Sequence, residues 1–223
     1  MSQIYFTKDF IRFFSSLEKN NNKEWFTANK ATYDVHVKQA FETFIKDLLT
    51  SIQKVDSSIH MEAKEAIFRI NRDIRFSKNG EPYKTYMSAA ISAGGKNPGY
   101  PGLFIEMSHS RIYLLGGAFH LEKDQLEALR KGIMRNHTAF KNLLKNKQFV
   151  KVFKEIQGEK NKVLSEPFKS FQTAEPLIAN KQFYYTVTLS KDALLEKNLV
   201  KLITDYYSAA KPMNQFLIEQ MGL

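Results

Sequence analysis

Cysteine is absent from this sequence of 223 residues. Its absence excludes disulfides, thiolate ligands for a metal and a cysteine nucleophile, and it favours a reducing compartment. Long apolar runs are also missing, so no segment is predicted to cross a bilayer. The N-terminal residues lack the basic and apolar regions of a signal peptide. We therefore expect a soluble cytoplasmic protein without a membrane partner.

Familiar catalytic motifs are equally scarce. The five histidines show no mutual spacing typical of metal ligands. The chain has neither the Gly-x-Ser-x-Gly elbow of many hydrolases nor a dinucleotide-binding fingerprint. We therefore expect no metal and no cofactor, and nothing in the sequence supports a hydrolase or a nicotinamide enzyme.

Positive charge is in excess, with a formal net charge of +10. A basic surface attracts anionic partners, which range from phosphorylated metabolites to nucleic acid. Hydrophobic residues make up 43% of the chain and charged residues 25%, as is usual for a globular protein with a substantial core.

Apolar periodicity places helices toward both ends of the chain and strands in the middle. Spacings of three and four predict helices over about 7–19, 25–52, 122–153 and 192–221. Alternation predicts strands over 86–92, 103–107, 111–115 and 182–189, with a hairpin link at 108–110. This order favours a single α+β domain over residues 1–223, with a largely antiparallel central sheet on which helices from both ends pack.

The most informative segment spans residues 68–85, where five cations stand among apolar and turn residues: Arg69, Arg72, Arg75, Lys78 and Lys84. In an extended chain, alternation gives one face to Arg69, Asn71, Asp73, Arg75 and Ser77, and the other to Ile70, Arg72, Ile74 and Phe76. A helix would mix charged and apolar residues on every side. We therefore predict a strand that ends in a turn at Asn79-Gly80.

This segment resembles the signature of the domain of unknown function 2461 family, found in bacteria and fungi. The matching positions are Arg69, Arg72, Asp73, Arg75, Phe76, Ser77, Lys78, Pro82, Tyr83 and Lys84. Residues 21–26, with Asn29, Lys30 and Tyr33, resemble the family's opening helix. Gly80 and Ala118 depart from the family pattern, which often has Lys and Gly there. The resemblance covers nearly the whole chain and implies a fold, but no reaction.

The arginine-rich segment supports a binding site for an anionic small molecule with a phosphate, sulfate or carboxylate group. Guanidinium groups form paired hydrogen bonds with such groups, and lysines add point charge. The candidate ligand-binding residues are Arg69, Arg72, Asp73, Arg75, Ser77, Lys78, Tyr83 and Lys84. If the site is catalytic, Asp73 is the candidate general base.

A structural interpretation of the same segment stays open. The arginines then pair internally with Asp73, Glu106, Glu81 or Glu65 and lock the sheet to the helices. The protein would then be an interaction module whose basic face docks an acidic partner. Buried ion pairs gain little stability, because desolvation offsets most of their attraction.

Two further groups of residues carry secondary hypotheses. Trp25, Asn29, Lys30 and Tyr33 share a predicted helix and form either the wall of a pocket or part of the core, and Glu106 is a further candidate on a predicted strand. The lysines between residues 141 and 162 form either a nucleic-acid-binding face or a solvated helix surface. Phe149 and Phe153 fit a core stripe there, so they are not expected to stack bases.

Overall fold

The computed structural model describes residues 3–73 and 80–223, which fall into two compact units. The first unit comprises Met1–Ile91, Phe104–Leu114 and Thr188–Asp205, and the second comprises Ser92–Leu103, Leu115–Val187 and Tyr206–Leu223.

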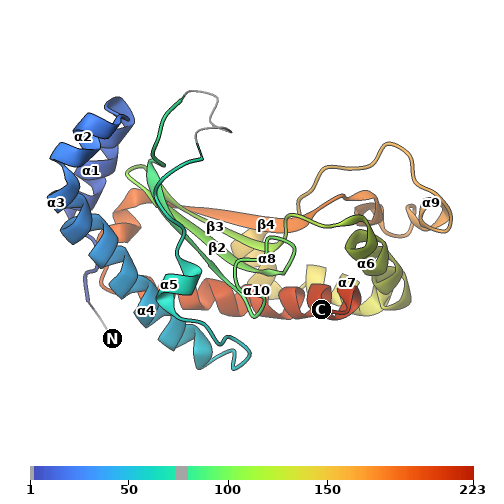
Figure 1. Cartoon of the computed structure of the whole chain (residues 1–223). Helices are drawn as coiled ribbons and strands as arrows, with labels where there is room; N and C mark the ends of the chain where they lie inside the picture. Colours follow the sequence, from blue (N-terminus) through green and yellow to red (C-terminus); the bar gives the residue numbers. More distant parts are fainter. Residues whose placement is uncertain (1–2, 74–79) are drawn as a thin grey trace. The chain divides into compact units, whose positions relative to one another are not determined.

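The fold is α+β, as the sequence predicts. Strands β1 (Tyr86–Ile91), β2 (Gly102–Ser108), β3 (Arg111–Ala118) and β4 (Phe183–Ser190) form one antiparallel sheet in that order. Figure 1 draws these strands as arrows, with β2 and β3 in green and β4 in orange.

The first unit begins with helix α1 (Lys8–Lys19), at the position that the sequence predicts. The Thr7 side chain accepts a hydrogen bond from the Asp9 N–H at 3.2 Å and so caps the helix start. The buried face of α1 consists of Phe10, Phe13, Phe14 and Leu17. This helix therefore forms because a cap precedes a stripe of large apolar side chains.

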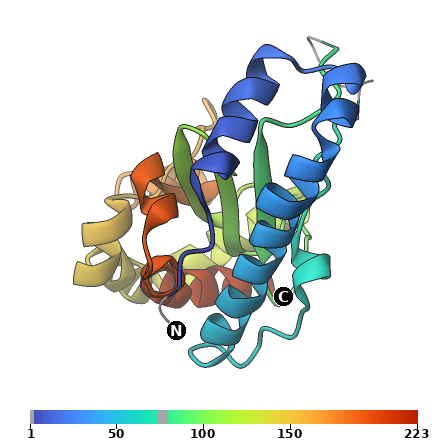
Figure 2. The same ribbon diagram turned by 90° about the vertical axis from the view of Figure 1, so that its left-hand side faces the viewer.

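A second helical run follows and lies beside α1 (Figures 1 and 2). It consists of α2 (Lys23–Ala28), α3 (Lys30–Thr32), the π-helix η1 (Tyr33–Gln39) and α4 (Ala40–Gln53). Asn22 caps α2 through its side chain, which accepts from the Trp25 N–H at 2.8 Å. Short helices α5 (Ala63–Ala66) and η4 (Lys191–Leu195) complete the unit with the start of α10 (Leu199–Met221). The predicted helix over 25–52 is therefore confirmed, with a junction at Asn29.

The second unit has its own core of buried apolar side chains. It contains α6 (Lys123–Arg135), α7 (His137–Leu144), α8 (Lys147–Phe153), α9 (Phe168–Phe171), η3 (Pro176–Ala179) and most of α10. Phe149 and Phe153 are each 2% exposed and pack on the ring of Tyr185. One helix is predicted over 122–153, but the structure has three. Asn146 explains the second break, because its side chain caps α8 by accepting from the Gln148 and Phe149 N–H groups.

Within residues 3–73 and 80–223, every helix is too short or too polar to cross a membrane.

Candidate functional site

The sheet in the first unit has two faces of different chemistry. One face is fully buried and carries Met87, Ala89 and Ile91 of β1, Ile105 and Met107 of β2, and Ile112 and Leu114 of β3. Because strand side chains alternate, the residues between these lie on the opposite face. That face carries buried Ser88 and half-buried Ala90 of β1, and also Tyr86, Phe104, Glu106, Arg111 and Tyr113, none of which is fully buried. The first unit therefore presents a polar and aromatic surface on one side of its sheet.

The arginine-rich segment pairs with the edge of this sheet. The Phe68 N–H donates to the Ser88 carbonyl at 2.9 Å, and Ile67 and Ala89 form an antiparallel bridge. Further along, the Arg72 N–H donates to the Pro82 carbonyl, and the Lys84 N–H donates to the Ile70 carbonyl, both at 2.8 Å. Over residues 67–72 the predicted strand is therefore found as two isolated bridges, of Ile67 with Ala89 and of Asn71 with Tyr83, with a bend at Ile70 between them.

This pairing brings three more side chains to the same surface. The rings of Phe68 and Phe104 have centroids 6.1 Å apart, and the Lys84 ammonium lies 5.4 Å from the Phe68 centroid. Arg72 interacts with the Tyr86 hydroxyl electrostatically. We call this surface the polar sheet face; it consists of Phe68, Arg72, Lys84, Tyr86, Phe104, Glu106, Arg111 and Tyr113.

Arg72 is held by one carboxylate. Its Nη1 donates to the Glu81 Oε2 at 3.0 Å, and the two side chains are 30% and 32% exposed. An ion pair that is this accessible to water contributes about 0–1 kcal/mol to stability. The structural interpretation is therefore supported by the contact of Arg72 with Glu81, but this contact is too weak to act as a lock.

Tyr86 lies between opposite charges. Burial raises the pKa of the Tyr86 hydroxyl, the negative charge of Glu106 raises it further, and the positive charge of Arg72 opposes both effects. The hydroxyl is therefore neutral at neutral pH and available as a hydrogen-bond donor. A neutral donor beside a guanidinium suits an anionic oxygen.

The Glu106 side chain is 16% exposed, less than the side chains of Arg72 (30%) and Arg111 (50%) on the same surface. Its Oε1 accepts from the Arg111 Nη2 at 3.3 Å. Strands β2 and β3 are joined by a two-residue link, so Ser108 at the end of β2 pairs with Arg111 at the start of β3. Two residues further from the link on each strand, Glu106 lies opposite Tyr113. The Arg111 guanidinium lies 5.2 Å from the Tyr113 ring centroid. These contacts fix the Glu106 carboxylate as an acceptor on the polar sheet face.

The start of the predicted Trp25 region is hydrogen-bonded to the arginine-rich segment. The Asn21 Nδ2 donates to the Tyr83 carbonyl at 2.9 Å, and the Tyr83 N–H donates to the Asn21 Oδ1 at 3.1 Å. The Tyr83 ring is 7% exposed and stacks on Phe26 at 4.0 Å. Two motifs that are far apart in the sequence therefore meet here, and Tyr83 packs into the core.

The other members of that region are also placed. The ring of Tyr33 is buried against Phe13 and Phe26, and half-buried Trp25 packs on Phe13 at 5.5 Å. The Asn29 Nδ2 donates to the Trp25 carbonyl at 2.9 Å, and Lys30 forms an exposed ion pair with Asp34 at 2.6 Å. These contacts fit the core interpretation for Trp25 and Tyr33 better than the pocket interpretation.

The remaining predicted ligand residues are Arg69, Asp73, Arg75, Ser77 and Lys78. Arg69 is exposed. Asp73 is half-buried. Arg75, Ser77 and Lys78 lie outside the described residues.

The lysines between residues 141 and 162 follow helices α7 and α8 of the second unit. Lys145, Lys147, Lys151, Lys154, Lys160 and Lys162 are exposed, and Lys141 lies 3.9 Å from the Glu175 carboxylate. Phe149 and Phe153 point into the core, as predicted. The surface is basic but offers no aromatic ring from these two residues.

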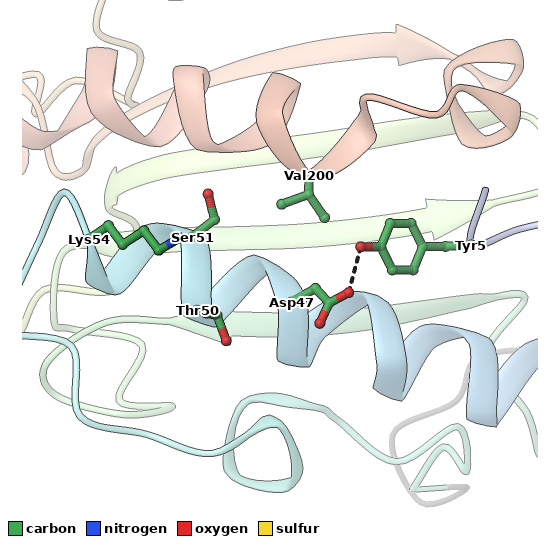
Figure 3. A pocket seen from close by; sticks show the side chains of 6 residues that line it. All are labelled: Tyr5, Asp47, Thr50, Ser51, Lys54 and Val200. Carbon is green, nitrogen blue, oxygen red and sulfur yellow. Dashed lines mark hydrogen bonds between the residues drawn. The ribbon is translucent and has the colours of Figure 1, made fainter. Parts of the chain in front are cut away.

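A separate pocket of the first unit has a volume of about 70 Å³ (Figure 3). It is lined by Tyr5, Asp47, Thr50, Ser51, Lys54 and Val200. The Tyr5 hydroxyl donates to the Asp47 Oδ2 at 2.7 Å, and burial together with this bond raises the pKa of Tyr5 to about 12. Small-molecule pockets usually measure about 300–1,000 Å³, so this one is too small for a metabolite.

Sequence analysis missed most of the polar sheet face. Tyr86, Phe104, Arg111 and Tyr113 were not singled out, although each alternates with a buried aliphatic residue in its strand. That alternation was the available signal, because it predicts a second face that is not aliphatic. In the described part of the chain, no three His, Asp or Glu side chains gather closely enough to hold a metal ion.

The fold and the site define an α+β protein with a polar, aromatic surface on one face of its sheet. The chain belongs to the family described as conserved hypothetical protein (DUF2461), whose model matches residues 9–216. A search of the curated proteins gives no match.

Proposed function

We propose that the protein binds a small anionic molecule on the polar sheet face, with Arg72 as the principal contact. The carrying observation is the Arg72–Glu81 pair, in which a half-buried guanidinium already holds a carboxylate oxygen at 3.0 Å. A guanidinium has five N–H donors in a planar fork that matches carboxylate, phosphate and sulfate groups. A ligand anion can therefore accept from other N–H donors of Arg72 beside the Glu81 carboxylate, or it can take the place of that carboxylate.

The surroundings of Arg72 support this proposal. Lys84 and Arg111 add positive charge to the same face, and the neutral Tyr86 hydroxyl adds a donor. Replacing Glu81 costs little, because a pair of this exposure contributes only about 0–1 kcal/mol. Arg75, Ser77 and Lys78 remain contacts predicted from the sequence alone, as does a catalytic role for Asp73.

Calorimetric titration with phosphate, pyrophosphate, sulfate and citrate at fixed ionic strength tests the proposal. Arg72→Gln removes the charge with little change in side-chain size. Hydrogen bonds to charged groups are worth about 1.5–3 kcal/mol, so the affinity should fall about tenfold or more. Glu81→Gln removes the internal competitor, so the affinity should rise several-fold.

A matched control is Arg12→Gln, since Arg12 is an exposed arginine that pairs with Asp9 at 3.4 Å on α1. It should leave anion affinity unchanged. The proposal fails if no anion binds, or if Arg72→Gln and Arg12→Gln bind anions equally well. Loss of folding in Arg72→Gln, with no anion bound by the native protein, would instead establish the structural interpretation.

A further inference from the structure

The polar sheet face is aromatic as well as basic. Its rings are Phe68, Tyr86, Phe104 and Tyr113, and all four are only half-buried. Large apolar groups that stay in contact with water on one surface often mark a binding site. A site for phosphate or sulfate alone needs no rings, because such ions bind only through donors and charge.

The rings and the charges are adjacent. Phe68 and Phe104 pack at 6.1 Å with Lys84 beside them, and Tyr113 lies under the Arg111 guanidinium at 5.2 Å. A planar base can stack on an aromatic ring or on a guanidinium plane. This surface therefore offers stacking positions for a flat ring within reach of cations for an anionic group.

Glu106 adds a third element of recognition. Its carboxylate is an acceptor on this face, 16% exposed and fixed by Arg111. A partly buried carboxylate repels a plain anion but suits an amino or ring N–H donor, as when a carboxylate accepts from the amino group of a base. The surface is thus complementary to a ligand with N–H donors at one end and negative charge at the other.

From these contacts we infer that the anion bound by this face is a nucleotide unit, a planar nitrogenous base joined to a phosphate. The inference rests on the proposed function and specifies its ligand class. The phosphate binds Arg72, the base stacks against Phe104 or Tyr113, and Glu106 accepts from the base. The unit comes either from a free mononucleotide or from a single-stranded oligonucleotide.

Equilibrium titrations with pyrophosphate, the monophosphates AMP, CMP, GMP and UMP, and a short single-stranded oligonucleotide test this inference. At least one nucleotide ligand should bind about tenfold more tightly than pyrophosphate, because stacking one base is worth about 1–3 kcal/mol. Tight binding of a monophosphate identifies a free nucleotide. Tight binding of the oligonucleotide alone identifies a single strand, and either result supports the inference.

Phe104→Leu tests the position of the base, because it keeps an apolar side chain and removes the ring. The ratio of nucleotide to pyrophosphate affinity should fall about tenfold. The control is Phe119→Leu, which removes a ring that is 42% exposed in the second unit, and it should keep the wild-type ratio. A variant that removes both rings of the face, Phe104→Leu with Tyr113→Leu, should abolish the preference.

The outcomes separate the two proposals. If pyrophosphate binds in an Arg72-dependent manner but no nucleotide binds more tightly, the nucleotide inference is overturned and anion binding stands. If neither class binds, both fail. If nucleotides bind with a preference that survives loss of both rings, the base lies elsewhere and the inference is overturned.

Discussion

The contact between Asn21 and Tyr83 predicts how much stability the arginine-rich segment loses when Asn21 is replaced. Asn21→Ala removes both hydrogen bonds that its side chain makes with the Tyr83 backbone, at 2.9 and 3.1 Å. Each such bond contributes about 0.5–1.5 kcal/mol, and Tyr83 is too buried for water to replace them fully. We therefore expect local stability at Tyr83 to fall by about 2 kcal/mol.

Amide hydrogen exchange measures this effect at the residue concerned. The Tyr83 N–H donates to Asn21, so in Asn21→Ala its protection should fall roughly 30-fold, as about 2 kcal/mol implies. The neighbouring Lys84 and Arg72 amides, which pair with Ile70 and Pro82, should lose protection to a smaller extent. Anion affinity should fall as well, because the segment that carries Arg72 loses its support.

Asn20→Ala is the control for this variant. The Asn20 Nδ2 donates to the Ser16 carbonyl at 3.0 Å on an exposed surface and does not touch Tyr83. It should leave the exchange rate of the Tyr83 amide unchanged. If Asn21→Ala leaves that amide as protected as in the native protein, the reasoning that Asn21 anchors the arginine-rich segment is refuted.

Three further predictions concern stability. Burial is the larger cause, and the charges of neighbouring carboxylates the smaller, that raise the pKa of Tyr33 from its usual 10 to about 12. The neutral hydroxyl therefore stabilises the fold below pH 10, and this contribution is lost as the pH rises toward 12. Urea titrations at several pH values measure the unfolding free energy over that interval, and in Tyr33→Phe this free energy should fall less between pH 10 and pH 12 than in the native protein. An equal fall in the two proteins would contradict the prediction. In urea titrations, Tyr185→Phe should lower the unfolding free energy by about 1–3 kcal/mol, because the buried Tyr185 hydroxyl donates to the Asn214 Oδ1 at 2.6 Å. An unfolding free energy equal to that of the native protein would argue against this hydrogen bond. Gly117→Ala should destabilise the protein more than either variant, since φ is 87° there and a Cβ would clash with the Phe183 carbonyl oxygen. A thermal unfolding midpoint equal to that of the native protein would refute this prediction.

The order of helices and strands was predictable because the apolar pattern is strong. The stripe of Phe10, Phe13, Phe14 and Leu17 and the alternation in β2 each specify one kind of element without help from distant residues. The break within 122–153 was not predicted. The apolar spacing continues across Asn146, and only the capping by its side chain shows where one helix ends and the next begins.

The candidate site was predictable in location but not in composition. The cations of residues 68–85 pointed to the edge of the sheet, and Arg72 and Lys84 lie on the polar sheet face. Tyr83 is a candidate ligand residue in the sequence; in the structure its ring stacks on Phe26 and its backbone carbonyl accepts from the Asn21 side chain. Which rings and charges lie beside Arg72 depends on how the strands pair, and pairing between distant segments is not encoded in the local pattern.

One measurement tests the central claim most directly. Hydrogen exchange of the native protein, with and without saturating pyrophosphate, maps where the anion binds. The account predicts slower exchange in residues 67–73, 80–88 and 104–113, around Arg72 and the polar sheet face. Slower exchange confined to residues 141–162, where the exposed lysines of α7 and α8 lie, would contradict it.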